Sequence, residues 1–121
     1  MIKKTILVVD DDEDLCQGVA AILAHEGYLV ECTSDALEAE ALINDRVFDI
    51  GLFDYKMPIS SGVELIKKIK AKNPSTKAFI MSGRPFIEKT IEEENASMLV
   101  DGIIKKPFND VALLEKIGGQ A

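Results

Sequence analysis

Short apolar runs alternate with stretches patterned as amphipathic helices along the 121 residues, and no other feature constrains the fold as strongly. The first run, Thr5 to Val9, reads TILVV and is continuously apolar, which is typical of a strand covered on both faces. The other expected strands lie within Tyr28 to Cys32, Phe48 to Asp54, Lys77 to Met81 and Leu99 to Ile104. Strands that alternate with helices form a parallel sheet with helices on both faces and right-handed crossovers.

Helix signals separate these runs. Leu15, Val19 and Leu23 share one face of a first helix, which Gly27 ends. A second helix is expected after an N-cap within Thr33–Asp35, and a third runs from Ser61-Gly62 to Asn73-Pro74. A fourth helix, with a poor apolar pattern, is expected over Phe86 to Met98. Asn109 caps a fifth helix, whose apolar face carries Val111, Leu113, Leu114 and Ile117. No linker or repeat interrupts the chain, so we expect residues 1–121 to form a single doubly wound α/β domain.

The net charge and the two cysteines limit the classes of function that the chain can have. Lys plus Arg is 14 and Asp plus Glu is 21, which gives a net charge of −7. A direct nucleic-acid binder would show a basic stripe, so this balance argues against that class and fits a cation site and protein partners. No apolar run is long enough for membrane insertion. Cys16 and Cys32 lack CxxC spacing, and we expect them to be reduced, buried packing residues of a cytoplasmic protein.

The stretch from Phe48 to Pro58 delivers one carboxylate, Asp54, at the tip of an apolar strand before Pro58 holds a turn. Rigid scaffolds carry function at such strand ends. The carboxyl ends of parallel strands share one edge of a sheet, and ligands bind there where the winding reverses. The polar groups delivered to that edge are Asp10, Asp11, Asp54, Ser82 and Lys106.

These five groups suit phosphoryl transfer. Three crowded carboxylates repel one another, and Mg²⁺, which prefers carboxylates, waters and a phosphoryl oxygen, relieves the repulsion. A lysine and a hydroxyl neutralise and hydrogen-bond the remaining phosphoryl oxygens. An aspartate between a metal and a cation is suited to attack on phosphorus, which forms an acyl phosphate. The set therefore predicts phosphoryl transfer to Asp54.

Simpler explanations account for part of the acidic run. Asp12 to Asp14 fit an N-cap and first-turn charges that favour the helix dipole. Helix capping does not explain why two acidic residues, Asp10 and Asp11, follow the end of the strand. Asp54 taken alone would be a turn-forming residue before Pro58. Only the convergence of the other strand ends favours a site.

Four motifs lie in order at the strand ends: ILVVDDD (6–12), FDIGLFDYKMPISSGVEL (48–65), FIMSG (79–83) and IIKKPF (103–108). Together they resemble the receiver domain of two-component response regulators over essentially the whole chain. The resemblance implies a flavodoxin-like doubly wound sheet of five parallel strands in the order 2-1-3-4-5.

The resemblance also implies a role for each site residue. Asp54 would accept a phosphoryl group from the phosphohistidine of a histidine kinase. Ser82 matches the family's hydroxyl that follows the phosphoryl group, and Lys106 matches the lysine paired with it. The implied Mg²⁺ ligands are Asp10, Asp11, Asp54 and the backbone carbonyl of Lys56.

The implied partners are a sensor histidine kinase or phosphotransfer protein and, after phosphorylation, a second copy of the chain or a downstream effector. The output surface would be formed by the fourth helix, the fifth strand and the fifth helix. The resemblance implies no enzyme activity beyond the chain's own phosphorylation and dephosphorylation.

Several residues depart from the family pattern. Ile103 stands where the fifth strand usually carries an aromatic switch residue. Because Arg84-Pro85 is atypical and the segment from Gly83 to Lys106 is long, we expect a displaced fourth helix. Lys56 and Arg84 flank the site, and we expect them to screen an acyl phosphate from water.

An enzyme on a similar scaffold is the rival class. A haloacid-dehalogenase-like phosphatase has DxDx[TV] after its first strand, and here Asp14 stands where Thr or Val belongs. A flavin binder needs a Ser/Thr-rich phosphate loop at the same place, which is acidic here. A receiver retained only as an interaction module is disfavoured because every phosphorylation residue is present.

Overall fold

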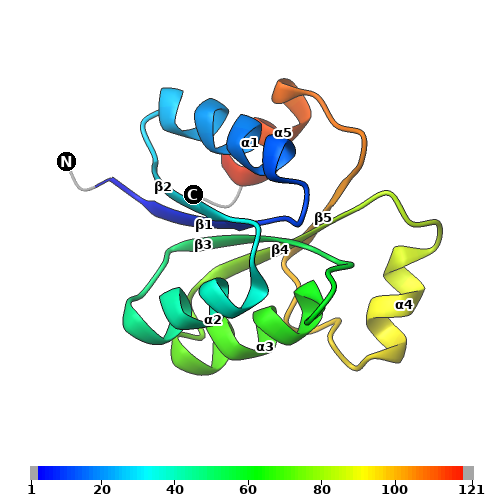
Figure 1. Cartoon of the computed structure of the whole chain (residues 1–121). Helices are drawn as coiled ribbons and strands as arrows, with labels where there is room; N and C mark the ends of the chain where they lie inside the picture. The colour runs from blue at the N-terminus through cyan, green and yellow to red at the C-terminus, as the bar shows by residue number, and fades with distance from the viewer. Residues whose placement is uncertain (1–2, 119–121) are drawn as a thin grey trace.

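The computed structural model describes residues 3–118, in which strands and helices alternate along the chain (Figure 1). The strands are β1 (Thr5–Val9), β2 (Leu29–Thr33), β3 (Ile50–Asp54), β4 (Lys77–Ser82) and β5 (Gly102–Lys105). The helices are α1 (Glu13–His25), α2 (Ala36–Asp45), α3 (Gly62–Lys72), α4 (Ile87–Glu93) and α5 (Asp110–Gly118). All neighbouring strands pair in parallel in the order β2-β1-β3-β4-β5, which confirms the predicted doubly wound sheet.

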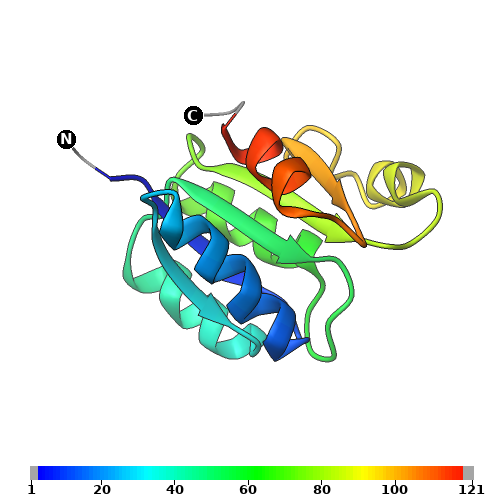
Figure 2. The ribbon, with the colours of Figure 1, turned by 90° about the horizontal axis from the view of Figure 1, so that it is seen from above.

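Helices cover both faces of the sheet. α1 and α5 lie on one face and α2 and α3 on the other, whereas α4 stands apart from the other helices in both ribbon views (Figures 1 and 2). Ile50 and Leu52 of β3 pack into the cluster that includes α1 and α5, while Phe53 packs into the cluster that includes α2 and α3. Because both faces of β3 are buried, its sequence shows no polar alternation.

The winding reverses between β1 and β3, since the chain runs from β1 outward to β2 and then returns to β3 on the other side of β1. Val9 and Phe53 are opposite each other in the register of this pair. The residues that follow them, Asp10 and Asp54, therefore leave β1 and end β3 at the same level. Ligands bind at this switch point in open α/β sheets.

The fourth helix is shorter than predicted. α4 covers Ile87–Glu93, and the prediction of a helix over 86–98 was wrong at both ends. Phe86 and Asn95 adopt left-handed backbone conformations, with φ of 57° and 58°, which a right-handed helix cannot contain. Two backbone N–H groups then donate to the carbonyl of Ala96, so that the following residues turn before β5 begins.

Smaller differences have local causes. β5 begins at Gly102, within the predicted stretch 99–104, and ends one residue beyond that stretch, at Lys105. Leu99 and Val100 are not in the strand, because they donate their backbone N–H groups to the carbonyl of Ala96 within the turn. β2 is shifted by one residue to Leu29–Thr33. Val111, predicted on the apolar face of α5, is 64% exposed, so that placement was wrong.

Two predicted helix caps are confirmed. Asp35 Oδ1 accepts from the backbone N–H of Leu37 at 2.9 Å at the start of α2. Asn109 Oδ1 accepts from the N–H of Ala112 at 2.8 Å before α5. Asp12 caps α1 in the same way, as the simpler explanation of the acidic run predicted.

Cys16 is buried, Cys32 is half-buried, and neither forms a disulfide. Burial, together with the neighbouring Cys32, raises the pKa of the Cys16 thiol to about 12. Cys16 is therefore a protonated packing residue at neutral pH, whereas Cys32 is more accessible than predicted. Among the described helices, none has both the length and the apolar character that a membrane span requires.

Gly62 allows α3 to begin directly against the end of β3. A Cβ atom at this position would lie 2.4 Å from the backbone oxygen of Asp54 and 3.0 Å from Ile80 Cδ1. The backbone of a buried strand cannot move aside as a flexible side chain can. We therefore predict that Gly62→Ala lowers the free energy of unfolding by about 1–3 kcal/mol, which thermal denaturation followed by circular dichroism will measure.

Gly18 provides the matched control for this prediction. It lies within α1, and a Cβ atom there would meet no heavy atom within 4 Å. Gly18→Ala should raise stability by about 0.5–1 kcal/mol because alanine restricts the unfolded chain. Equal melting temperatures for Gly62→Ala and the native chain would contradict the proposed close approach.

Candidate functional site

Asp10 and Asp54 share one cation at the switch point. Lys106 Nζ donates to Asp10 Oδ2 at 2.7 Å and to Asp54 Oδ1 at 3.2 Å. The side chain of Asp10 is fully buried, and that of Asp54 is 11% exposed. Asp10 Oδ1 also accepts from the backbone N–H of Asp12 at 2.9 Å. Asp10 is thus a fixed anion that orients Lys106, whereas Asp54 has its second oxygen available.

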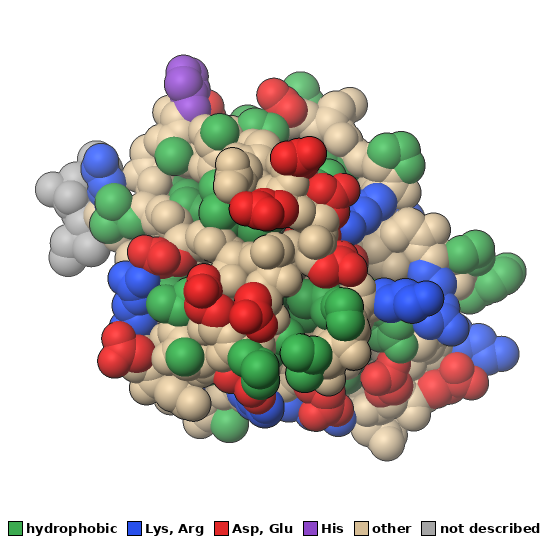
Figure 3. Space-filling model, viewed as in Figure 1, with side chains coloured by type: hydrophobic (Ala, Val, Ile, Leu, Met, Phe, Trp, Pro, Cys, Tyr) green, Lys and Arg blue, Asp and Glu red, His purple; other side chains and the backbone are tan. Residues whose placement is uncertain are grey.

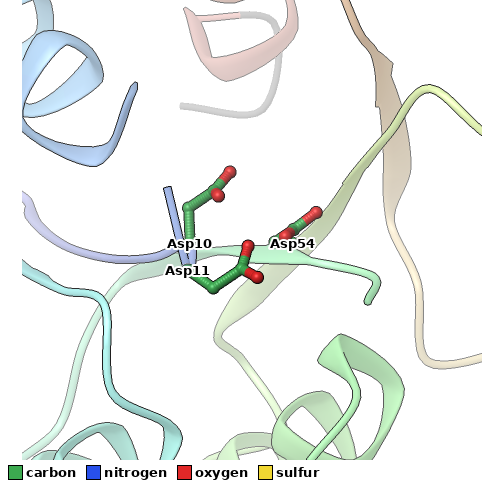
Figure 4. Close-up of side chains that lie close together, drawn as sticks. All are labelled: Asp10, Asp11 and Asp54. Atoms are coloured by element: carbon green, nitrogen blue, oxygen red, sulfur yellow. The ribbon is translucent and has the colours of Figure 1, made fainter. Parts of the chain in front are cut away.

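The third carboxylate, Asp11, is exposed beside this pair. One oxygen from each of Asp10, Asp11 and Asp54 lies within 4.8 Å of the others. Figure 4 shows the three side chains close together, with Asp10 and Asp11 coming from the end of β1 and Asp54 from the end of β3. Three carboxylates facing one lysine leave an excess of negative charge and offer hard oxygen ligands, so the donor set fits a divalent cation such as Mg²⁺.

The electrostatics favour the same conclusion. Burial, followed by the negative charge of Asp10, raises the pKa of Asp54 to about 7, and the Lys106 ammonium only partly opposes this. Burial lowers the pKa of Lys106, but its hydrogen bond and attraction to Asp10 and Asp54 outweigh burial and raise it. A carboxylate acts as a nucleophile only when it is ionised, and a nearby divalent cation favours the ionised form.

A cavity of about 490 Å³ opens beside Asp54. It is lined by Asp54, Tyr55, Lys56, Ser82, Gly83, Arg84 and Lys106. Ser82, the last residue of β4, is 5% exposed, and its Oγ accepts from the backbone N–H of Arg84 at 3.0 Å. Because Oγ already accepts a bond, the hydroxyl proton remains available to an anion in the cavity. The backbone N–H of Lys106 donates to the carbonyl of Ser82 at 2.9 Å, which holds β4 and β5 together at this edge.

The structure therefore brings together the five side chains that the sequence singles out at the strand ends; their chemical roles stay predictions. Lys105 points elsewhere, since it is exposed and lies 3.2 Å from Glu88 of α4. Ile103, in the place of the aromatic switch residue, is partly buried against the core. The peptide between Lys106 and Pro107 is cis.

Sequence reasoning did not identify Tyr55 as part of the site. The guanidinium carbon of Arg84 lies 5.5 Å from the centroid of the Tyr55 ring, and the Tyr55 hydroxyl donates to the carboxylate of Glu94. Tyr55 and Glu94 are 39 residues apart, and no local pattern connects them. The available signal was the position of Tyr55, directly after Asp54.

Comparison with known proteins agrees with this geometry. The chain resembles a CheY-like response regulator receiver domain protein from Methanospirillum hungatei JF-1, with 37% identity, a TM-score of 0.88, and coverage of 98% of this chain and 94% of that one. It also resembles chemotaxis response regulator CheY4 of Vibrio cholerae, with 28% identity, a TM-score of 0.88, and coverage of 99% and 100%.

Curated relatives are longer than this chain. Transcriptional regulatory protein ZraR of Klebsiella oxytoca is 36% identical over 100 residues, which are 83% of this chain and 22% of that protein. Response regulator RR06 of Streptococcus pneumoniae is 31% identical over 112 residues, 93% of this chain and 50% of that protein. The family model of the response regulator receiver domain matches residues 6–118. The chain therefore belongs to the receiver domain family of two-component response regulators, which are phosphorylatable signalling switches.

Proposed function

We propose that Asp54 accepts a phosphoryl group from the phosphohistidine of a sensor histidine kinase or a phosphotransfer protein. The observation that carries this proposal is the Lys106 ammonium shared between buried Asp10 and Asp54, beside a cavity that also contains the Ser82 hydroxyl. The arrangement offers one nucleophile, one fixed anion and two groups that can bind phosphoryl oxygens.

In the proposed reaction an oxygen of the Asp54 carboxylate attacks phosphorus. The P–N bond to the donor imidazole breaks, its electron pair returns to the imidazole nitrogen, and an acyl phosphate forms on Asp54. The Mg²⁺ ligands would be Asp10, Asp11, Asp54 and the backbone carbonyl of Lys56. When bound, Mg²⁺ supplies positive charge that offsets the carboxylates and the phosphoryl oxygens.

Lys106 and Ser82 would bind the product. Lys106 lines the cavity, and its ammonium is bonded to Asp10. The ammonium can therefore turn from Asp54 Oδ1 to a phosphoryl oxygen without leaving Asp10. The Ser82 proton can be donated to a second phosphoryl oxygen. The chain would thus catalyse only its own phosphorylation and dephosphorylation, in the cytoplasm, where its partner kinases present phosphohistidine.

The output surface in this proposal is formed by α4, β5 and α5. A groove of about 630 Å³ lies along β5 and α5 and includes Ile103, Phe108 and Ala112. Lys105 and Lys116 also line this groove, and Figure 3 shows Lys and Arg side chains gathered on the side of the molecule where α4 lies. Phosphorylation would change how this surface binds an effector or a second copy of the chain.

Incubation with acetyl phosphate and Mg²⁺ tests the proposal directly. We predict that the intact mass of the native chain rises by one phosphoryl group and that removal of Mg²⁺ with a chelator prevents the rise. Asp54→Asn should stay unlabelled because an amide is a poor nucleophile. Asp45→Asn, at the exposed end of α2, should be labelled like the native chain. Absence of an adduct on the native chain would refute the proposal.

Lys106→Met should destabilise the chain when no divalent cation is present. The substitution leaves two buried carboxylates without their counter-charge, and losing one partner of a buried ion pair costs about 3–5 kcal/mol. Urea denaturation of Lys106→Met and Lys105→Met gives the comparison, because Lys105 is 70% exposed and its solvent-exposed pair with Glu88 contributes little to stability. Equal losses in the two variants would contradict the shared role of Lys106.

Lys56 and Arg84 line the cavity and are both exposed. Their long cationic side chains would screen the acyl phosphate from attacking water. We predict that the double variant Lys56→Ala/Arg84→Ala loses its phosphoryl group faster than the native chain, as measured by decay of the mass adduct after the donor is removed. An unchanged decay rate would exclude this screening.

A further inference from the structure

Tyr55 contacts both the phosphorylation site and α4. Its hydroxyl donates to the carboxylate of Glu94, the residue that caps the C-terminal end of α4. The guanidinium of Arg84 lies over its ring at 5.5 Å, and both side chains line the cavity beside Asp54. One half-buried side chain therefore connects a cation in the site to a helix outside it.

Apart from the bond between Tyr55 and Glu94, few contacts fix the position of α4. It is seven residues long and places Ile87 and Ile91 in the core. Phe86 at its N-cap is 80% exposed, has a left-handed backbone and makes no capping hydrogen bond with its side chain. The ion pair between Glu88 and Lys105 is exposed, and such pairs contribute little. The separation of α4 from the other helices is visible in Figures 1 and 2.

On the basis of the proposed phosphorylation of Asp54, we infer that Tyr55 couples the phosphoryl group to the position of α4. Ile103, in the place of the usual aromatic switch residue, has no hydrogen-bonding group and cannot make such a link. Tyr55 lies one residue from the acceptor and is already bonded to the helix, so a single side chain reaches from the site to α4.

The coupling follows from the charges around Tyr55. A phosphoryl group adds about −1.5 to −2 charges at pH 7. Its oxygens suit the planar fork of Arg84, whose charge-assisted bonds to phosphate are stronger than an exposed contact with an aromatic ring. Arg84 then leaves the Tyr55 ring for the phosphoryl group. The positive charge of Arg84 makes the Tyr55 hydroxyl more acidic and so a stronger donor. When Arg84 leaves the ring, the Tyr55–Glu94 bond weakens, and the C-terminal end of α4 is released.

Tyr55→Phe tests this coupling, because it keeps the ring under Arg84 and removes the bond to Glu94. The readout is the amide NMR spectrum with and without acetyl phosphate and Mg²⁺. In unphosphorylated Tyr55→Phe, the amides of 87–94 should move toward their positions in the phosphorylated native chain. Loss of a hydrogen bond to a charged group raises the released population about tenfold or more. Amides near Ser82 and Lys106 should still respond to phosphorylation.

Two further variants complete the test. Glu94→Gln removes the charge that strengthens the bond and should shift the same α4 amides in the same direction, and it serves if Tyr55→Phe does not fold. Tyr28→Phe changes a tyrosine that packs with the α1–α5 cluster, on the other face of the sheet, and should behave like the native chain.

Unshifted α4 amides in both Tyr55→Phe and Glu94→Gln, with a normal phosphorylation response, would overturn the coupling while leaving Asp54 as the acceptor. Failure of the native chain to form a mass adduct would instead overturn the proposed function itself.

Discussion

The site depends on the single ammonium of Lys106, which bonds to two buried carboxylates from different strands. Asp10 follows β1 and Asp54 ends β3, and neither is stable as a buried anion without a counter-charge. Lys106 follows β5, so the three strands must end at the same level for the contact to form. The parallel register of the strands supplies that alignment. The backbone N–H of Lys106 also donates to the carbonyl of Ser82, which aligns the end of β4 with the same site. The stability of the fold and the proposed reactivity of Asp54 therefore depend on the same interaction.

The same ammonium does not neutralise the whole site. Asp11 adds a third carboxylate, and the pKa of Asp54 stays raised to about 7 despite Lys106. A site built in this way needs more positive charge before Asp54 is fully ionised, and a divalent cation supplies it. A bound divalent cation would therefore raise the ionised fraction of Asp54, which the proposed phosphoryl transfer requires.

The sequence predicted the structure correctly wherever a local pattern of residues determines it. The apolar run before Asp54 predicted β3, and the parallel topology then predicted that Asp10, Ser82 and Lys106 would lie nearby. Sequence patterns did not predict the features that depend on backbone conformation or on contacts between residues distant in the sequence. The end of α4 depends on the left-handed conformation of Asn95, and the contact between Tyr55 and Glu94 depends on how the loop after β3 meets that helix. Neither has a periodic signal in the sequence.

Chemical mapping of the modified residue would establish whether Asp54 itself carries the phosphoryl group. Borohydride reduces an acyl phosphate to the corresponding alcohol, which marks the residue permanently for peptide mass spectrometry. After phosphorylation by a phosphohistidine donor, we expect the reduced residue at position 54. Reduction at Asp10 or Asp11, or a phosphoryl group found on His25, would contradict it.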